Sequence, residues 1–389
     1  MIDKVIYINY QAITKKYYYD YYLKDCIDNG LDVEYWDVSK WFYPSLEFHS
    51  DVDFSNINYI KSNSELKRLL STKNINSTFF ITNINFNFKV LRLFITLSSF
   101  KCTLAFFGRG MLPDAPQKYK SKVIKALLSL NFKKLINPLK NKSTILFKKY
   151  KIVKPLDFLF QAGSEGAKGV GFGSFYDLKY ATIININYFD YDKFLSVNQN
   201  EVLVENKYCV FMDQYLAHHP DIPMSGLKNV NAEIYYSDLN SFFGNIEKKY
   251  NLKVVIAAHP KATKYLTHNP FEGRKIIFEK TCELVKDSTF VLTHHSTAIS
   301  FPILFEKPII FINSQVLLDA MPGLYDLTIF FAKYLNSELV DLDNFDENKD
   351  FNLVIDKEIY TSYKYKFLSS EGSEGKLTSQ IFIETLFSL

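Results

Sequence analysis

Histidines gather in one part of the chain. Six of the seven lie between positions 218 and 295, namely His218, His219, His259, His268, His294 and His295. Most of them follow a short apolar run with the composition of a buried β-strand. Imidazole is the side chain that gains or gives a proton near neutral pH. Because the carboxyl ends of parallel strands meet at one edge of a sheet, these histidines predict a polar site at such an edge.

The first motif is HPKA at 259–262, directly after the apolar run VVIAA. His259 can donate a hydrogen bond to a phosphate oxygen or protonate a leaving group, so it is a candidate catalytic residue. Pro260 fixes the direction in which the chain leaves the strand, and Lys261 adds a cation. The alternative is a strand-ending turn that contains an incidental histidine.

The second motif is HHST at 294–297, between the apolar run FVLT and a predicted helix over about 297–306. Ser296 and Thr297 are good caps for that helix, which is their structural alternative. The same position favours an anion, since the first N–H groups of a helix are unpaired and two hydroxyls stand beside them. The motif therefore predicts a phosphate site with His295 next to it.

Two further strand ends carry polar residues. Asp213 and Gln214 end the run YCVFMDQ, where Asp213 is a candidate for catalysis or for binding the hydroxyls of a ligand, and otherwise caps the following turn. His219 shares that loop. The segment FEKT at 278–281 follows the run KIIF, and there Thr281 either faces a ligand or simply caps a helix.

The first half also has polar residues after its predicted strands, among them candidates for substrate binding and for a base. After the run CTLAFF the chain continues GRGMLPD, which holds Arg109, Gly110 and Asp114. Arg109 can hold a carboxylate through two parallel hydrogen bonds. Glu165 lies in the glycine-rich AGSEGAKGVGFG, and it competes with Asp114 for the role of base. That loop lacks the glycine spacing of dinucleotide or P-loop sites.

These residues need a scaffold that aligns strand ends, and the chain predicts one. At 389 residues with 47 % hydrophobic residues it can form two domains with substantial cores. Apolar runs alternate with helical segments, which favours parallel sheets covered on both faces. The predicted strands are 5–10, 33–38, 77–84, 102–108, 157–163 and 181–187, then 208–213, 254–259, 275–279, 290–294 and 308–312. Helices are predicted up to about 29 and at 63–71, 86–98, 234–250, 281–287 and 375–388.

The segment at 190–206 is polar and loses periodicity, so it marks a domain boundary. We predict an α/β fold of two Rossmann-like domains facing across a cleft. The first spans 1–190, the second spans 207–374, and a helix at 375–389 crosses back to the first domain.

The net charge of +4 is unevenly distributed. Residues 118–154 contain 12 lysines and no acidic residue, so the rest of the chain carries a net charge of −8. This basic, amphipathic segment suits an anionic membrane surface; the alternative is a solvated face of two packed helices. The acidic remainder disfavours nucleic acid.

No apolar window is long enough to span a bilayer, and the first residues do not form a signal peptide. Four scattered cysteines lack the spacing of a metal site and are typical of a reduced cytosolic protein. No pattern of metal ligands is present, and we expect no metal and no cofactor.

In order and spacing, HP at 259–260, FEKT and the later Ser296–Thr297 pair resemble the nucleotide half of bacterial GT-B glycosyltransferases. The similarity is greatest to those that use CMP-activated nonulosonic or ulosonic acids, that is sialyltransferases and Kdo transferases of capsule and lipopolysaccharide synthesis. It covers about a hundred residues, 208–312. The acidic motif of the sialyltransferases is absent, since Gly108, Arg109 and Gly110 stand in its place.

The resemblance implies transfer of an acidic sugar from a CMP donor to a surface glycan or lipid-linked oligosaccharide, in the cytoplasm at the inner membrane. It assigns the donor to one set of residues and the acceptor to another. The donor set is Pro260, Lys261, Phe278, Glu279, Thr281, His295, Ser296 and Thr297; the acceptor set is Arg109, Gly110, Gln214 and His219; the catalytic candidates are His259, Asp114, Glu165 and Asp213. Two alternatives stay open: a UDP-sugar transferase or epimerase of the same fold, and a non-catalytic scaffold of a polysaccharide-synthesis complex.

Overall fold

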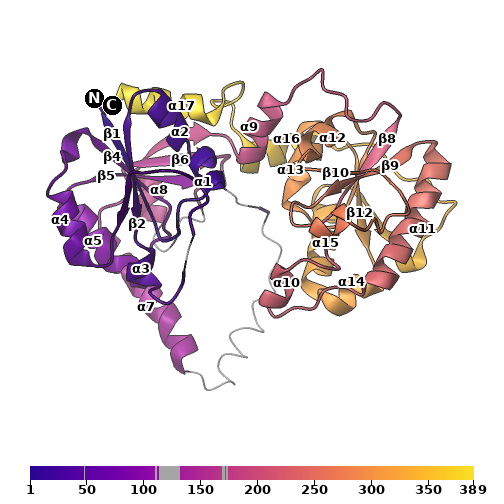
Figure 1. Cartoon of the computed structure of the whole chain (residues 1–389), viewed down its shortest axis with the longest axis horizontal. Helices are drawn as coiled ribbons and strands as arrows, with labels where there is room; N and C mark the ends of the chain where they lie inside the picture. The colour runs from indigo at the N-terminus through magenta and orange to yellow at the C-terminus, as the bar shows by residue number, and fades with distance from the viewer. Residues whose placement is uncertain (48, 110–111, 114–131, 169–170, 172–173) are drawn as a thin grey trace. The chain divides into compact units, whose positions relative to one another are not determined.

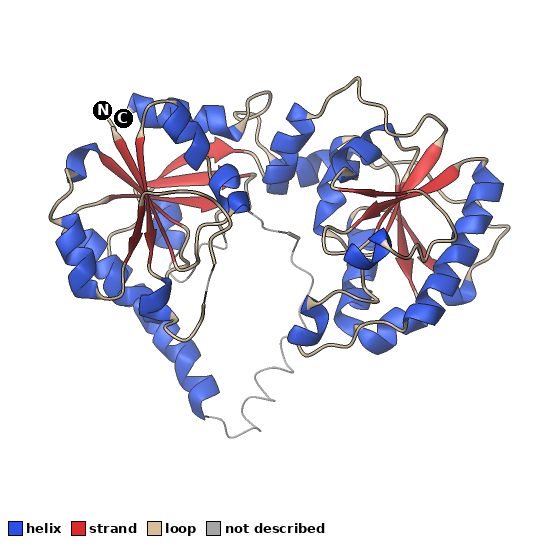
Figure 2. Cartoon of the chain, viewed as in Figure 1, coloured by secondary structure: helices blue, strands red, loops and turns tan. Residues whose placement is uncertain are grey.

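A computed structural model of the chain describes residues 1–47, 49–109, 112–113, 132–168, 171 and 174–389. It contains two separate sheets, each with helices on both faces (Figures 1 and 2). The described chain divides into two compact domains. The first is Met1–Phe189 together with Tyr365–Leu389, and the second is Asp190–Lys364.

The sheet of the first domain has seven parallel strands in the order β3-β2-β1-β4-β5-β6-β7. Its strands are β1 (Lys4–Asn9), β2 (Asp32–Asp37), β3 (Ile57–Tyr59), β4 (Thr78–Thr82), β5 (Thr103–Gly108), β6 (Phe158–Ala162) and β7 (Thr182–Ile186). Its helices are α1 (Lys15–Asp20), α2 (Leu23–Asp28), α3 (Ser39–Phe42), α4 (Asn63–Leu70), α5 (Leu91–Ser99), α7 (Phe132–Lys149), α8 (Ser174–Tyr180) and α17 (Thr378–Ser388).

The sheet of the second domain has six parallel strands in the order β10-β9-β8-β11-β12-β13. Its strands are β8 (Tyr208–Met212), β9 (Lys253–Ala258), β10 (Ile276–Phe278), β11 (Val291–Thr293), β12 (Ile309–Asn313) and β13 (Glu338–Asp341). Its helices are α9 (Phe189–Ser196), α10 (Asp221–Met224), α11 (Ala232–Tyr250), α12 (Thr281–Asp287), α13 (Ser300–Leu304), α14 (Gln315–Ala320), α15 (Pro322–Tyr334) and α16 (Lys357–Tyr363).

The central strands, such as β1, β4, β8 and β12, are mostly apolar because both faces of each sheet are buried there. In β1, Ile6 and Ile8 pack into one hydrophobic cluster, whereas Val5 and Tyr7 pack into another on the opposite face. Neighbouring side chains of a strand point to opposite faces, so a strand with two buried faces shows no alternation of polar and apolar residues. All eleven predicted strands are present.

The chain end joins the first domain. Phe382 of α17 is fully buried against Phe107 and Phe160, with ring centroids 5.3 and 5.1 Å apart. Gly163 has a φ of 62° and touches the backbone of Lys366, so a β-carbon at this position would overlap that backbone. The glycine therefore permits the chain end to lie close to the loop after β6.

The basic segment is described only from α7 onward, and residues 118–131 lie outside the described part. Lys148 does not belong to a solvated face, because it is buried and pairs with the buried carboxylate of Asp177. Lys142 and Lys149 are exposed beside the exposed apolar side chains of Leu146 and Tyr150. Among the described residues no helix is both long and apolar enough to cross a membrane.

Candidate functional site

The strand order of the second sheet locates the candidate site. From β8 the chain proceeds outward to β9 and β10, then returns to the other side of β8 and forms β11, β12 and β13. In open α/β sheets, ligands bind beyond the carboxyl ends of the strands at this reversal. Asp213 follows β8, and His294 and His295 follow β11, so the sequence-predicted residues flank the reversal.

Asp213 is the most unusual residue at this edge. Its side chain is buried, and neither carboxylate oxygen has a hydrogen-bond partner of regular geometry. Burial raises the pKa of this carboxyl group to about 6, although backbone N–H groups of Tyr215, Gln214 and His259 and the hydroxyl of Tyr265 lie close enough to oppose the rise. The donors are therefore nearby but not bonded, which leaves both oxygens able to accept from a ligand.

Asp213 is not alone in this respect. Buried polar atoms without a hydrogen-bond partner recur at the ends of β8, β11 and β12: both oxygens of Asp213, Gln214 Oε1, His295 Nε2 and Asn313 Oδ1. Leaving such an atom unpaired costs about 1–3 kcal/mol, so native chains rarely collect several in one place. Three adjacent strands presenting them at one edge is typical of a site that a polar ligand completes.

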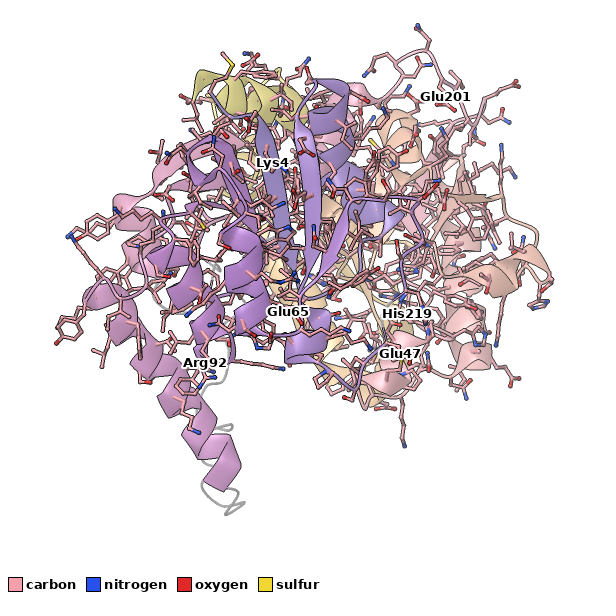
Figure 3. All side chains as sticks on the ribbon, turned by 60° about the vertical axis from the view of Figure 1, so that its left-hand side comes forward. Lys4, Glu47, Glu65, Arg92, Glu201 and His219 are labelled. Atoms are coloured by element: carbon pink, nitrogen blue, oxygen red, sulfur yellow. The ribbon has the colours of Figure 1, made fainter. Side chains whose placement is uncertain are left out.

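His259 and His219 form a pair on the loops after β9 and β8, with ring centroids 4.8 Å apart (His219 is labelled in Figure 3). His259 Nδ1 accepts from the backbone N–H of Lys261 at 3.1 Å, and His219 Nδ1 accepts from that of Asp221 at 3.2 Å. With Nδ1 accepting in each ring, the neutral imidazole carries its proton on Nε2 and can donate from there.

Burial, together with neighbouring positive charge, favours the neutral form of both imidazoles at pH 7. The pKa of His259 is lowered first by burial, then by His219 and Lys261. Burial also lowers the pKa of His219. Lys261, whose side chain is half-exposed, pairs with Asp221. His259 therefore suits hydrogen-bond donation to a phosphate better than full proton transfer.

The two adjacent histidines after β11 have different roles. His294 is fully buried: its Nδ1 lies 2.7 Å from the carbonyl oxygen of Ile312, and its Nε2 lies 2.9 Å from the hydroxyl of Tyr235. Nδ1 thus donates, Nε2 accepts, and burial lowers the pKa of His294 to about 4. His294 is a structural residue that joins β11, β12 and α11.

His295 differs from His294, because its Nε2 is buried without a hydrogen-bond partner. Its ring packs on Phe331 with centroids 4.4 Å apart, and its carbonyl oxygen accepts from Gln214 Nε2. Burial lowers the pKa of this imidazole to about 4. Gln214 and His295, predicted for acceptor and donor respectively, are therefore in contact with each other.

The predicted helix cap is present at Ser296. Ser296 Oγ accepts from the N–H of Ala298 at 3.2 Å and begins a short 3₁₀ turn, Thr297–Ile299, which continues into the five-residue α13. The predicted helix is thus shorter and tighter at its start. Ser296 keeps its hydroxyl proton for a ligand, and Thr297 is exposed.

The residues of FEKT that were predicted to contact the donor lie at the end of β10 and directly after it. Phe278 is half-buried and Glu279 is exposed in a left-handed conformation, with φ at 56°. Lys280, not Thr281, occupies the cap position of α12, and it pairs with Glu201 and Glu283. Pro260 is exposed on the neighbouring loop after β9.

In the first domain Arg109 is already engaged. One terminal nitrogen donates to the carbonyl oxygen of Asp20 at 3.0 Å and the other to the hydroxyl of Tyr22 at 2.6 Å, whereas Nε is buried without a partner. The guanidinium carbon lies 4.3 Å from the ring centroid of Phe189 and 4.8 Å from that of Phe107. These two bonds use two of the five N–H donors of the guanidinium, so a second N–H on each terminal nitrogen and the Nε–H remain for a carboxylate.

Glu165 lies on the loop after β6 and pairs with Lys168. The glycines near it serve backbone packing: a β-carbon on Gly166 would overlap the carbonyl oxygen of Gly108. Gly110 and Asp114 lie outside the described residues.

Sequence reasoning missed a cavity of about 320 Å³ where the first sheet reverses, at the ends of β1 and β4. Asn9 and Asn83 line it, with Asn83 Nδ2 donating to Tyr17 at 2.6 Å and Asn83 Oδ1 unpaired. Tyr21 stacks on Tyr17 with centroids 4.3 Å apart. The signal was present in the sequence, because Asn9 ends β1 and Asn83 directly follows β4. Among the described residues no His, Cys, Asp and Glu side chains are grouped as metal ligands.

No protein-family model and no curated protein sequence matches the chain. Solved structures align over almost the whole length with low identity. The UDP-GlcNAc 2-epimerase of Methanocaldococcus jannaschii has 12 % identity, covers 99 % of this chain and 100 % of its own, and gives a TM-score of 0.46. A putative UDP-N-acetylglucosamine 2-epimerase of Listeria monocytogenes has 10 % identity, coverages of 100 % and 96 %, and a TM-score of 0.45. MurG of Acinetobacter baumannii has 8 % identity, coverages of 100 % and 100 %, and a TM-score of 0.42.

At this level of similarity no activity is transferred to the chain. Its own topology, two Rossmann-like parallel sheets with the last helix in the first domain, is GT-B-like. The resemblance to CMP-sugar transferases gains no support from these structures.

Proposed function

We propose that the chain is a nucleotide-sugar enzyme whose second domain holds the donor beyond the carboxyl ends of β8, β9 and β11. The observation that carries the proposal is the set of unpaired buried polar atoms at that edge, above all the carboxylate of Asp213. A buried carboxylate can accept hydrogen bonds from ribose and sugar hydroxyls, and these bonds offset the free-energy cost of burying it.

The phosphate of the donor would lie between the loops after β9 and β11. His259 donates from Nε2, and Ser296 and the exposed Thr297 offer hydroxyl protons. The donated bond from His259 strengthens as negative charge develops on the departing phosphate, so it favours the transition state over the ground state. Lys261 adds positive charge nearby, but its pairing with Asp221 reduces this contribution.

Within this class, the finer proposal is transfer of a CMP-activated acidic sugar to a glycan at an anionic membrane surface. It rests on the order HP, FEKT and Ser296–Thr297 and on the exposed lysines of α7. The acceptor sugar would occupy the aromatic and carboxamide cavity of the first domain, with Glu165 or Asp114 as the base.

The alternative within the class is an enzyme that uses a UDP-sugar, by transfer or by epimerisation. Two of the structurally similar proteins are named for UDP-N-acetylglucosamine, which is why UDP belongs in the first test. Epimerisation requires no acceptor site, so the two reactions differ in their need for a second substrate.

The test is a thermal-shift comparison of CMP, UDP, GMP and AMP, with the wild-type chain and the Ser296→Ala/Thr297→Ala variant. A ligand at about 100 times its Kd stabilises a fold by about 2.7 kcal/mol, a shift of a few degrees in Tm. We expect one pyrimidine nucleotide to raise Tm in the wild type and much less in the variant. Equal responses in both proteins, or no response to any nucleotide, would contradict the proposal.

A further inference from the structure

The second domain contains a cavity that is lined by none of the predicted functional residues. Its volume is about 590 Å³, within the usual size of a small-molecule pocket. It lies between the loop after β8, the first turns of α11 and the segment after β9. His218, Tyr236, Lys264, Tyr265 and His268 are the lining residues that matter below.

The floor of this cavity is aromatic and fixed in place. Tyr236 and Tyr265 are buried, and their hydroxyl groups are hydrogen-bonded to each other at 2.9 Å. Tyr215 meets the edge of Tyr265 at 5.2 Å and that of His218 at 5.7 Å, measured between ring centroids. Such a floor offers an apolar surface for a ring and needs no rearrangement to receive it.

The rim is basic. Lys264 Nζ lies 3.3 Å from His218 Nδ1. The pKa of His218 is lowered first by burial, then by the charges of Lys264 and His268, so these three groups share one electrostatic environment. Glu233 is the one carboxylate among the described lining residues, and no ion pair joins it to any of the three. Lys264 supplies a positive charge without a counter-ion among these lining residues, and the two imidazoles add ring nitrogens that can hydrogen-bond, so the rim favours an anion.

We infer that this cavity binds a small organic anion, with its carboxylate or phosphate at Lys264, His218 and His268 and its ring on Tyr236 and Tyr265. This inference does not depend on the proposed function, since none of these residues is assigned to the nucleotide. The two sites are neighbours, however, because the hydroxyl of Tyr265 also lies close to Asp213. An occupant that contacts Tyr265 therefore lies next to the candidate active site.

The test uses benzoate, which combines a ring with a carboxylate, and follows the imidazole signals of the intact chain by NMR. Acetate lacks the ring and benzyl alcohol lacks the charge. We expect benzoate to shift the signals of His218 and His268, identified with His218→Gln and His268→Gln variants, and to bind more tightly than either control compound.

Two lysine variants on neighbouring elements separate a built site from general charge attraction. Lys264→Gln should weaken benzoate binding by about tenfold or more, the loss expected for a charge-assisted hydrogen bond. Lys248→Gln, an exposed lysine in the last turn of α11, should leave it unchanged. Equal losses in both variants, shifts at His219 and His259 instead, or equal affinity for acetate and benzoate would overturn the inference. Because CMP and UDP are absent from this experiment, its result is distinct from that of the nucleotide screen.

Discussion

Replacing Asp213 with asparagine should stabilise the chain at neutral pH and at the same time impair ligand binding. The carboxyl group holds its proton more tightly in the folded chain, with a pKa of about 6, than in the unfolded chain, where its ordinary value is 3.8. Ionised Asp213 therefore lowers the unfolding free energy as pH rises from 3.8 through about 6, and the loss is complete above that. Each pKa unit corresponds to about 1.4 kcal/mol, so the loss approaches about 3 kcal/mol.

Asparagine has nearly the same shape and no charge to bury. Its Oδ1 can accept from the N–H groups around Asp213, and the hydroxyl of Tyr265 can turn to accept from its amide. The free energy of unfolding of the asparagine variant should exceed that of the wild type by close to zero at about pH 4 and by about 2–3 kcal/mol near pH 7.5. A stabilising change that abolishes binding is the pattern expected of a residue retained for function.

The assay is urea denaturation at several pH values, with a probe placed in the second domain, since the two domains need not unfold together. Asp221→Asn is the matched control on the same loop. Asp221 is exposed and its pKa is lowered by pairing with Lys261, so its replacement should give no gain at any pH. If Asp213→Asn destabilises the chain equally at low and neutral pH, the carboxylate is bonded in the native fold and the reasoning about it is wrong.

Three further predictions follow from buried groups and from His259. His259→Ala should bind the nucleotide with a Kd within about tenfold of the wild-type value, measured by calorimetry, but its kcat should be at least about a hundredfold lower, measured by steady-state kinetics. Unchanged turnover in a folded variant would show that His259 takes no part in the mechanism. Burial lowers the pKa of His294 to about 4, so the folded chain resists protonation and its free energy of unfolding decreases as pH falls from 6.5 toward 4. His294→Gln should therefore reduce the pH dependence of the free energy of unfolding in this range. An unchanged pH dependence in the variant would contradict this. Lys148→Met should lower the free energy of unfolding by about 3–5 kcal/mol, because it leaves Asp177 charged and buried. The double variant Lys148→Met/Asp177→Asn should recover most of this loss. If Lys148→Met alone is as stable in urea as the wild type, the pair is solvated.

The sheets could be predicted from the sequence because most of their strands are buried on both faces and so form largely apolar runs. Two strands were missed, β3 and β13, and both are short edge strands. β3 is INY and β13 is ELVD, and of their seven residues only Val340 is buried. Edge strands expose one side to solvent and lose the apolar signal. The polar segment taken as a linker contains α9, whose apolar contacts, such as Phe194 on Phe305, come from a distant part of the chain.

The candidate site could be predicted at the level of strand ends but not of individual side chains. His294 and His295 are adjacent and chemically identical, and only Tyr235 and Ile312 decide that the first is structural. Ser296 was predicted as both cap and ligand, and the structure shows the cap. The engagement of Arg109 by Asp20 and Tyr22 joins residues almost ninety positions apart, which no local pattern reveals.

The most direct test of the central claim is a crystal structure of the chain, determined after the crystals are soaked with CMP and, separately, with UDP. We predict that one of them binds beyond the carboxyl ends of β8, β9 and β11. Its phosphate should lie within hydrogen-bond distance of His259 Nε2 and the hydroxyls of Ser296 and Thr297, and a ribose or sugar hydroxyl should donate to Asp213. A nucleotide bound elsewhere, or Asp213 left without a ligand contact in an occupied site, would contradict the account.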